Sequence, residues 1–156
     1  KAQQVVEQPE LLELNLAVSY YYLGDFERAL AILAASKNQD KYPLETALVY
    51  FKLGQFEKAL AYLLLEQNQD ERYFELLGDI WLALGDLKAA QQSYLKITHP
   101  SAKIYFLLGI VALATERKQA EAYFAKSKAA DLKVYQQLQQ QYQDLAQLLT
   151  NGKASS

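Results

Sequence analysis

Apolar residues recur along this chain at three- and four-residue steps, the spacing that places side chains on one face of an α-helix. The first such segment runs from Pro9 to Leu23 and carries two apolar stripes. One stripe contains Leu12, Leu16 and Tyr20. The other contains Leu11, Leu14, Val18, Tyr21 and Tyr22. A helix with two apolar stripes has two surfaces to bury.

Glycine and polar residues interrupt this pattern and divide the chain into predicted helices. We expect Gly24 and Gly54 to end helices, because glycine adopts a left-handed backbone at low cost. Asp25, Asp70 and Ser101 are predicted to cap the helices that follow them. The segments 1–8 and 151–156 are polar, and we expect them to be frayed or disordered. The helices are predicted at 9–23, 26–36, 43–53, 56–67, 73–84, 87–97, 102–114, 116–130 and 131–150.

One stretch of the sequence occurs twice. LGDFERALAIL begins at Leu23, LGQFEKALAYL begins at Leu53, and each is followed by an Asn-Gln-Asp turn. The turn glycines Gly24, Gly54 and Gly85 follow one another at nearly equal steps. Steps of about 30 residues lie within the range of about 20 to 50 residues that is typical of stacked repeat proteins. We therefore predict four helix pairs and a C-terminal capping helix, with approximate bounds 9–38, 39–68, 69–99, 100–130 and 131–150.

These pairs resemble the tetratricopeptide repeat (TPR), whose pattern is W-x2-L-G-x2-Y, then A-x3-F, then P. The third pair matches it with Phe74, Leu77, Gly78, Trp81, Ala90 and Tyr94. The fourth matches with Tyr105, Leu108, Gly109, Ala112, Ala120 and Phe124. The first two match with Ala17, Tyr20, Ala29, Ala47, Tyr50 and Ala59.

The resemblance covers residues 9–130 and implies an all-α fold, a right-handed superhelical stack of about four antiparallel helix pairs. It also implies that Tyr20, Tyr50 and Trp81 belong to the core. The period of about 30 residues is shorter than the usual period of about 34 residues in the family, so the chain resembles a short-period variant. The terminal proline of the motif is absent or displaced, with only Pro100 near the expected place.

In TPR proteins the first helix of each pair lines a concave groove. The resemblance therefore implies a non-catalytic interaction scaffold, an adaptor or chaperone-like module, that binds an apolar or amphipathic peptide segment of another protein. The groove residues that it implies are Leu14, Val18, Tyr21, Tyr22, Lys41, Leu44, Leu48, Phe51, Lys52, Arg72, Asp79, Lys103, Phe106 and Ile110. The Lys and Asn clamp by which one subclass grips a terminal carboxylate is missing, because Leu14 and Val18 stand at its first-repeat positions.

Other interpretations of the same stripes remain open. The side chains can simply pack against the next repeat or against the terminal helix. The chain can also be a self-assembling homo-oligomeric scaffold that uses its exposed apolar stripe or the seam from Tyr135 to Leu149. A narrower form of the first hypothesis is similarity to the small repeat chaperones of bacterial secretion systems, which share its length, acidity and apolar groove.

Composition narrows the function classes. The formal net charge of −2 gives no electrostatic reason to expect nucleic acid. The absence of cysteine excludes disulfides, thiolate catalysis and Cys-ligated metal sites, and it gives no indication of the compartment. No segment approaches the roughly 18 apolar residues of a membrane span, so we expect no membrane insertion. The chain begins at Lys1 and contains no methionine, so we expect a mature form or an excised region.

No constellation for catalysis, cofactor or metal binding is present, and we predict that the protein is not an enzyme. His99 is the only histidine, and we expect it in an exposed turn rather than as a catalytic base. The Asn-Gln-Asp turns each offer one carboxylate, which suits a helix cap better than a calcium loop. The five glutamines between Gln136 and Gln141 are expected on the solvated face of the capping helix.

Overall fold

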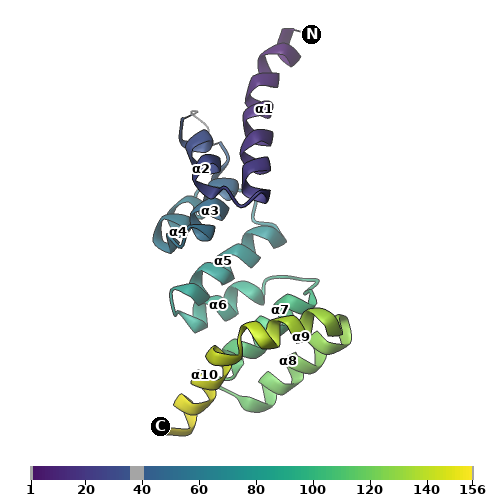
Figure 1. The fold of residues 1–156 in the computed structure, drawn as a ribbon. Helices are drawn as coiled ribbons and strands as arrows, with labels where there is room; N and C mark the ends of the chain where they lie inside the picture. The colour runs from purple at the N-terminus through teal and green to yellow at the C-terminus, as the bar shows by residue number, and fades with distance from the viewer. Residues whose placement is uncertain (1, 36–40, 156) are drawn as a thin grey trace. The chain divides into compact units, whose positions relative to one another are not determined.

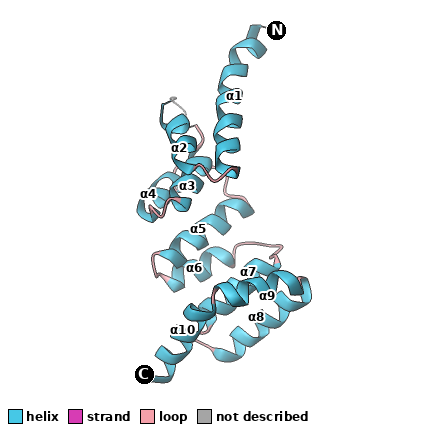
Figure 2. Ribbon diagram, in the orientation of Figure 1, coloured by secondary structure: helices cyan, strands magenta, loops and turns pink. Residues whose placement is uncertain are grey.

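The computed structural model describes residues 2–35 and 41–155, which form α-helices joined by turns and loops, with no strand in these ranges (Figure 2). The predicted all-α class is thereby confirmed. The predicted ends at Lys1, Ser36 and Ser156, and the first Asn-Gln-Asp turn, lie outside the described residues. The described helices are α1 (Ala2–Tyr22), α2 (Phe26–Ala35), α3 (Pro43–Lys52), α4 (Phe56–Leu63), α5 (Glu71–Ala83), α6 (Leu87–Tyr94), α7 (Ala102–Ala112), α8 (Arg117–Ala130), α9 (Leu132–Gln141) and α10 (Gln143–Ser155) (Figure 1).

The chain divides into two compact units, Lys1–Leu84 and Gly85–Ser156. The first contains α1 to α5, and the second contains α6 to α10. Inside the first unit, α1 packs on α2, α2 on α3, α3 on α4 and α4 on α5. Inside the second, α6 packs on α7, α7 on α8 and α8 on α9. Each helix thus packs mainly on its neighbours in the sequence, which is typical of helical repeats.

Glycine ends α1 and α3 with the same backbone geometry. The φ angles of Gly24 and Gly54 are +81° and +76°, in the left-handed region that favours glycine. The Gly24 amide donates to the Tyr21 carbonyl at 3.0 Å, and the Asp25 amide donates to the Tyr20 carbonyl at 2.9 Å. The equivalent residues around Gly54 repeat both bonds at the same lengths. This is a Schellman arrangement, and it confirms the predicted glycine turns.

Three predicted helix caps are also present. Asp25 Oδ1 accepts from the Arg28 amide at 3.2 Å, and Asp70 Oδ1 accepts from the Tyr73 amide at 3.2 Å. Ser101 Oγ accepts from the Ile104 amide at 3.3 Å. Each cap satisfies an amide of the first helical turn that has no partner inside the helix. The predicted capping role of Asp70 is confirmed.

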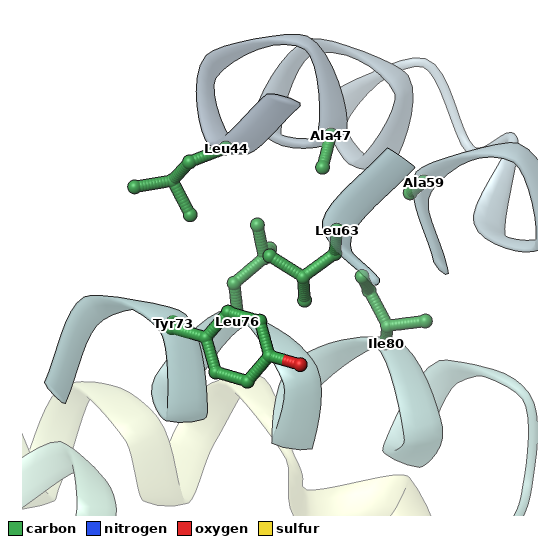
Figure 3. Close-up of a cluster of buried hydrophobic side chains, with 7 residues drawn as sticks. All are labelled: Leu44, Ala47, Ala59, Leu63, Tyr73, Leu76 and Ile80. Carbon is green, nitrogen blue, oxygen red and sulfur yellow. The ribbon is translucent and has the colours of Figure 1, made fainter. Parts of the chain in front are cut away.

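The core of the first unit contains two hydrophobic clusters. One brings together buried side chains of α3, α4 and α5 (Figure 3). Its members are Leu44, Ala47, Ala59, Leu63, Tyr73, Leu76 and Ile80. The other brings together buried side chains of α1, α2 and α3, namely Ala17, Ala29, Leu33 and Val49. The small residues Ala59 in the first cluster and Ala29 in the second let neighbouring helices approach closely.

In the second unit, α7 is buried on nearly all sides, because α6, α8 and α9 each pack against it. Gly109 of α7 lies directly under the ring of Phe124 of α8. Ser127 of α8 is fully buried, and its hydroxyl donates to the Ala102 carbonyl at 2.7 Å. The Phe106 ring lies 5.6 Å from that of Tyr135 in α9. These contacts join α7, α8 and α9 into one packed group.

The structure differs from the predicted elements at both ends. The first helix begins at Ala2 rather than Pro9, so Pro9 lies inside the helix, where its nitrogen cannot donate a backbone hydrogen bond. The predicted single helix at 131–150 is two helices, since the backbone at Tyr142 leaves the helical region (φ −102°, ψ 13°). The second of them, α10, continues through the predicted disordered tail to Ser155.

The aromatic residues assigned to the core by the TPR pattern are less buried than expected. Tyr20, Tyr50 and Trp81 are all half-buried. Tyr50 stacks on the ring of Tyr62 with centroids 5.3 Å apart, and the Lys58 ammonium lies 5.8 Å from the Tyr50 centroid. Partial exposure suits tyrosine, because its hydroxyl retains hydrogen bonds to water.

Candidate functional site

The end of α1 presents the first part of the predicted groove. Leu14, Val18 and Tyr21 are half-buried, whereas Tyr22 is 81% exposed. The Tyr21 ring packs edge-on against Tyr22 at 5.5 Å and against Phe26 of α2 at 5.6 Å. Tyr21 is therefore anchored by its neighbours and shows only part of its surface. Tyr22 projects beside it as a large apolar side chain with little cover.

On α3 the equivalent positions of the next repeat show the same arrangement. Leu48 and Phe51 are half-buried and pack against the core of the first unit. Phe51 contacts Phe56 of α4 at 5.5 Å, as Tyr21 contacts Phe26. Lys52, the counterpart of Tyr22, is exposed. Leu44 is different, because its side chain is only 5% exposed and belongs to the core between α3 and α5.

The charged residues of the predicted groove occupy several environments. Lys41 and Arg72 are exposed, and Asp79 and Lys103 are half-buried. The Lys41 ammonium lies 5.8 Å from the centroid of the Tyr42 ring, a cation–π distance. Arg72 Nη2 lies 3.4 Å from Asp70 Oδ2, so the helix cap also neutralises part of the guanidinium charge. An exposed pair of this kind contributes about 0–1 kcal/mol to stability.

The two apolar groove residues predicted in the second unit are buried by their own chain. Phe106 is 2% exposed, and Ile110 is fully buried. The Phe106 ring contacts Phe124, Tyr135 and Tyr142 at 5.3, 5.6 and 5.9 Å. Phe106 therefore packs against the terminal segment, as in the alternative interpretation in which these side chains serve only internal packing. The physical reason is that the terminal segment brings the rings of Tyr135 and Tyr142 onto this side of α7.

The remaining candidate chemistry is sparse among the described residues. His99 is exposed in the loop before α7, and its Nδ1 lies 3.1 Å from the Thr98 hydroxyl. In the described part of the chain, no group of three or more His, Cys, Asp or Glu side chains is arranged to hold a metal ion. Burial raises the pKa of Tyr73 above its ordinary value of 10.0, and the nearby negative charge of Glu66 adds to this effect.

One exposed apolar surface is not part of the predicted groove. Leu12, Leu16 and Leu23 are 66%, 50% and 79% exposed, although the stripe that contains Leu12, Leu16 and Tyr20 was expected to be buried. At the equivalent positions of the next repeat, Tyr42 and Leu53 pack against a buried cluster. The sequence of α1 alone does not reveal the exposure of its leucines, because the exposure depends on packing: α1 packs mainly on α2, through Ala17 and Tyr21.

Along the described residues, no helix is both long enough and apolar enough to cross a membrane. Comparison with models of protein families gives no match, and comparison with curated proteins gives none either.

Proposed function

We propose that the chain is a non-catalytic protein-interaction module that binds an apolar or amphipathic peptide along the first helices of its helix pairs. In this proposal the pairs form a right-handed superhelical TPR stack closed by the terminal helices. The observation that carries it is the repeated row on α1 and α3. Val18 and Leu48 stand at equivalent positions of this row, as do Tyr21 and Phe51, and all four are half-buried.

Half-burial supports binding because such side chains are fixed by the core and still offer apolar surface. Tyr21 and Phe51 are held by Phe26 and Phe56, so little side-chain entropy is lost when a partner covers them. Aromatic anchors of this kind carry much of the binding energy in protein interfaces. Tyr22, at 81% exposure, adds apolar area beside them.

The charges near the row favour an acidic partner segment. Lys41 precedes α3 and Lys52 ends it, and both are exposed. Two exposed ammonium groups at the ends of an apolar row suit a peptide with apolar residues in its middle and carboxylates at its flanks. Phe106 and Ile110 are not part of this proposed site, because the chain itself buries both side chains.

The proposal is tested with a displayed library of random peptides selected on the intact chain. We expect enrichment of sequences that combine leucine or aromatic residues with Asp or Glu. Tyr22→Glu and Leu48→Glu should abolish the enrichment, since each places a carboxylate on the apolar row. Leu64→Glu is the matched control, because Leu64 is 60% exposed and lies outside the row.

Circular dichroism and thermal melting must first show that each variant stays folded. Selection that yields no common motif, or a motif that Tyr22→Glu and Leu48→Glu retain, would contradict the proposal.

Self-assembly is a second candidate, and the exposed leucines of the terminal helices favour it. Leu132 and Leu148 are 55% and 68% exposed. Light scattering over a concentration series should show growth in mass for the intact chain and a constant mass for Leu148→Glu. A constant monomer mass for the intact chain at every concentration excludes this candidate.

A further inference from the structure

The packing between successive helix pairs follows one rule inside the first unit. Ala29 and Leu33 of α2 form a buried cluster with Val49 of α3, and Tyr42 and Leu53 pack against it. The second helix of one pair thus covers one face of the first helix of the next pair. The covered face of α3, including its flanking residues, consists of Tyr42, Thr46, Val49 and Leu53.

The same rule holds between α4 and α5. Ala59 and Leu63, the counterparts of Ala29 and Leu33 in the next repeat, share a buried cluster with Tyr73 and Ile80 (Figure 3). Leu77 and Leu84 pack against that cluster as partly buried side chains. The covered face of α5 therefore consists of Tyr73, Leu77, Ile80 and Leu84, each one repeat after its counterpart on α3.

The second unit gives a third case, one further repeat along the chain. Ala90 and Tyr94 of α6 are fully buried, and α6 packs on α7. On α7, Ile104, Leu108 and Val111, the counterparts of Tyr73, Leu77 and Ile80, are all 3% exposed or less, in a helix on which α8 and α9 also pack. In all three cases the covering helix presents an alanine and, four residues later, a large apolar side chain.

The corresponding face of α1 lies one repeat before that of α3, and no helix among the described residues covers it in this way. We define the outer face of α1 as Leu12, Leu16, Ser19 and the turn residue Leu23. Its leucines are 66%, 50% and 79% exposed, and Ser19 is also exposed. By contrast, Thr46 and Val49, the counterparts of Leu16 and Ser19, are 0% and 2% exposed.

Ser19 is compatible with burial of this face. Its hydroxyl donates to the Asn15 carbonyl at 2.8 Å, so covering it leaves no unpaired donor. The buried Thr46 makes the same bond, from its hydroxyl to the Tyr42 carbonyl at 2.8 Å. A hydroxyl bonded within its own helix is thus already present inside one covered face of this fold.

We propose that the outer face of α1 binds an amphipathic helix that does not belong to residues 1–156. The occupant would present a small residue and a large apolar residue four positions apart, as α2, α4 and α6 do. This surface is separate from the proposed peptide groove. Its occupant is specified by the three covered faces of the same fold, because each shows which helix chemistry fits a face of this kind.

The test uses the full chain with Asn15→Cys, labelled with an environment-sensitive dye. Asn15 is exposed on α1 and lies beside the outer face, so the label does not occupy the surface that the peptide covers. The chain contains no other cysteine, so the dye reports only on this place. The probe is a synthetic peptide that copies residues 25–35 and is stapled between positions 27 and 31. Glu27 and Ala31 are both exposed in α2, so the staple lies away from the alanine and leucine of the covering face.

We expect saturable binding with a blue shift of the dye emission. Leu12→Glu and Leu16→Glu should each weaken it by about tenfold or more, because a carboxylate would be buried without a partner. Leu64→Glu should leave it unchanged. A peptide with the Ala29→Glu substitution should not bind, and this arm does not depend on the folding of any protein variant.

Two outcomes would overturn the proposal. One is that the peptide fails to bind this face, seen either as no saturable binding at millimolar peptide or as binding that Leu12→Glu and Leu16→Glu do not weaken. The other is a blue shift that grows with protein concentration in the absence of peptide, which would identify a second copy of this chain as the occupant.

Discussion

The ring of Phe124 lies so close to the backbone of Gly109 that a methyl group at residue 109 has no room. An ideal Cβ on Gly109 would lie 2.6 Å from Cε1 and 2.7 Å from Cδ1 of Phe124. The ring cannot move away freely, because Phe106 and Tyr135 pack against it with centroids at 5.3 and 6.3 Å. Close approach of α7 and α8 therefore depends on glycine at this position.

We expect Gly109→Ala to lower the free energy of unfolding by about 1–2 kcal/mol, because overpacking costs about 1–3 kcal/mol and alanine recovers about 0.5–1 kcal/mol of helix propensity relative to glycine. Urea denaturation followed by circular dichroism measures the difference. In the double variant with Phe124→Leu the smaller side chain should relieve the clash. A stability loss in the double variant equal to the sum of the losses in the two single variants would contradict the proposed contact.

A different cause makes Gly54 intolerant of substitution. Nothing lies within 4 Å of a Cβ added there, but its φ is +76°. Gly54→Ala should therefore cost about 1–2 kcal/mol of stability through backbone strain alone. Gly54→Asn should cost less, because asparagine adopts the left-handed region more readily. Thermal melting of both variants checks this order, and equal losses would point to a cause other than φ.

The buried hydroxyl of Ser127 links α8 to the first turn of α7. Ser127→Ala removes its 2.7 Å bond to the Ala102 carbonyl and should lower the free energy of unfolding by about 1 kcal/mol. Ser93→Ala is the matched control, because the Ser93 hydroxyl bonds the Ala89 carbonyl within its own helix at 2.8 Å. We expect a smaller loss for the control in urea denaturation. A loss at Ser93 equal to that at Ser127 would show that the link between helices adds nothing.

Stability should fall at high pH partly because of Tyr73. Burial first, and the charge of Glu66 second, raise the pKa of Tyr73 above 10.0 in the folded chain. Above that pH the unfolded chain releases the phenolic proton while the folded chain retains it, so deprotonation favours unfolding. Below it the phenol is neutral in both states, and this contribution is constant.

Tyr73→Phe should therefore lose less stability than the intact chain as the pH rises above about 10. Denaturation at a series of pH values measures the two slopes. Parallel slopes would mean that Tyr73 ionises equally in both states.

Local signals of the sequence were sufficient for the turns and caps. Gly24, Gly54 and Gly85 all have positive φ, a backbone conformation that glycine adopts at lower free-energy cost than other residues. Asp70 and Ser101 cap their helices because a short polar side chain reaches the amide three residues on. These features depend on a few neighbouring residues, which the sequence displays directly. The regular spacing of the turn glycines then predicted the order and type of the helices.

Packing between residues far apart in the sequence was harder to predict from the sequence. The Phe106 ring is covered in part by those of Tyr135 and Tyr142, which lie in α9 and at its C-terminal end, far from Phe106 in the sequence. Leu44 and Leu14 occupy equivalent repeat positions, yet Leu44 is buried and Leu14 is half-buried. Such differences in burial depend on which helices pack against a given helix, and the residue pattern of that helix alone does not reveal its neighbours. The break at Tyr142 carries neither glycine nor proline, so no breaker residue marks it.

The packing of each helix on its neighbours in the sequence also has a kinetic consequence. Contacts between helices within each unit mostly join helices that are adjacent in the sequence, so only short loops close as the chain folds. Helical proteins with such local contacts fold on the order of microseconds to milliseconds. Opening can also start at one end and stop at a helix boundary. Amide hydrogens of α1, which packs mainly on α2 among the described helices, should therefore exchange faster than those of α3.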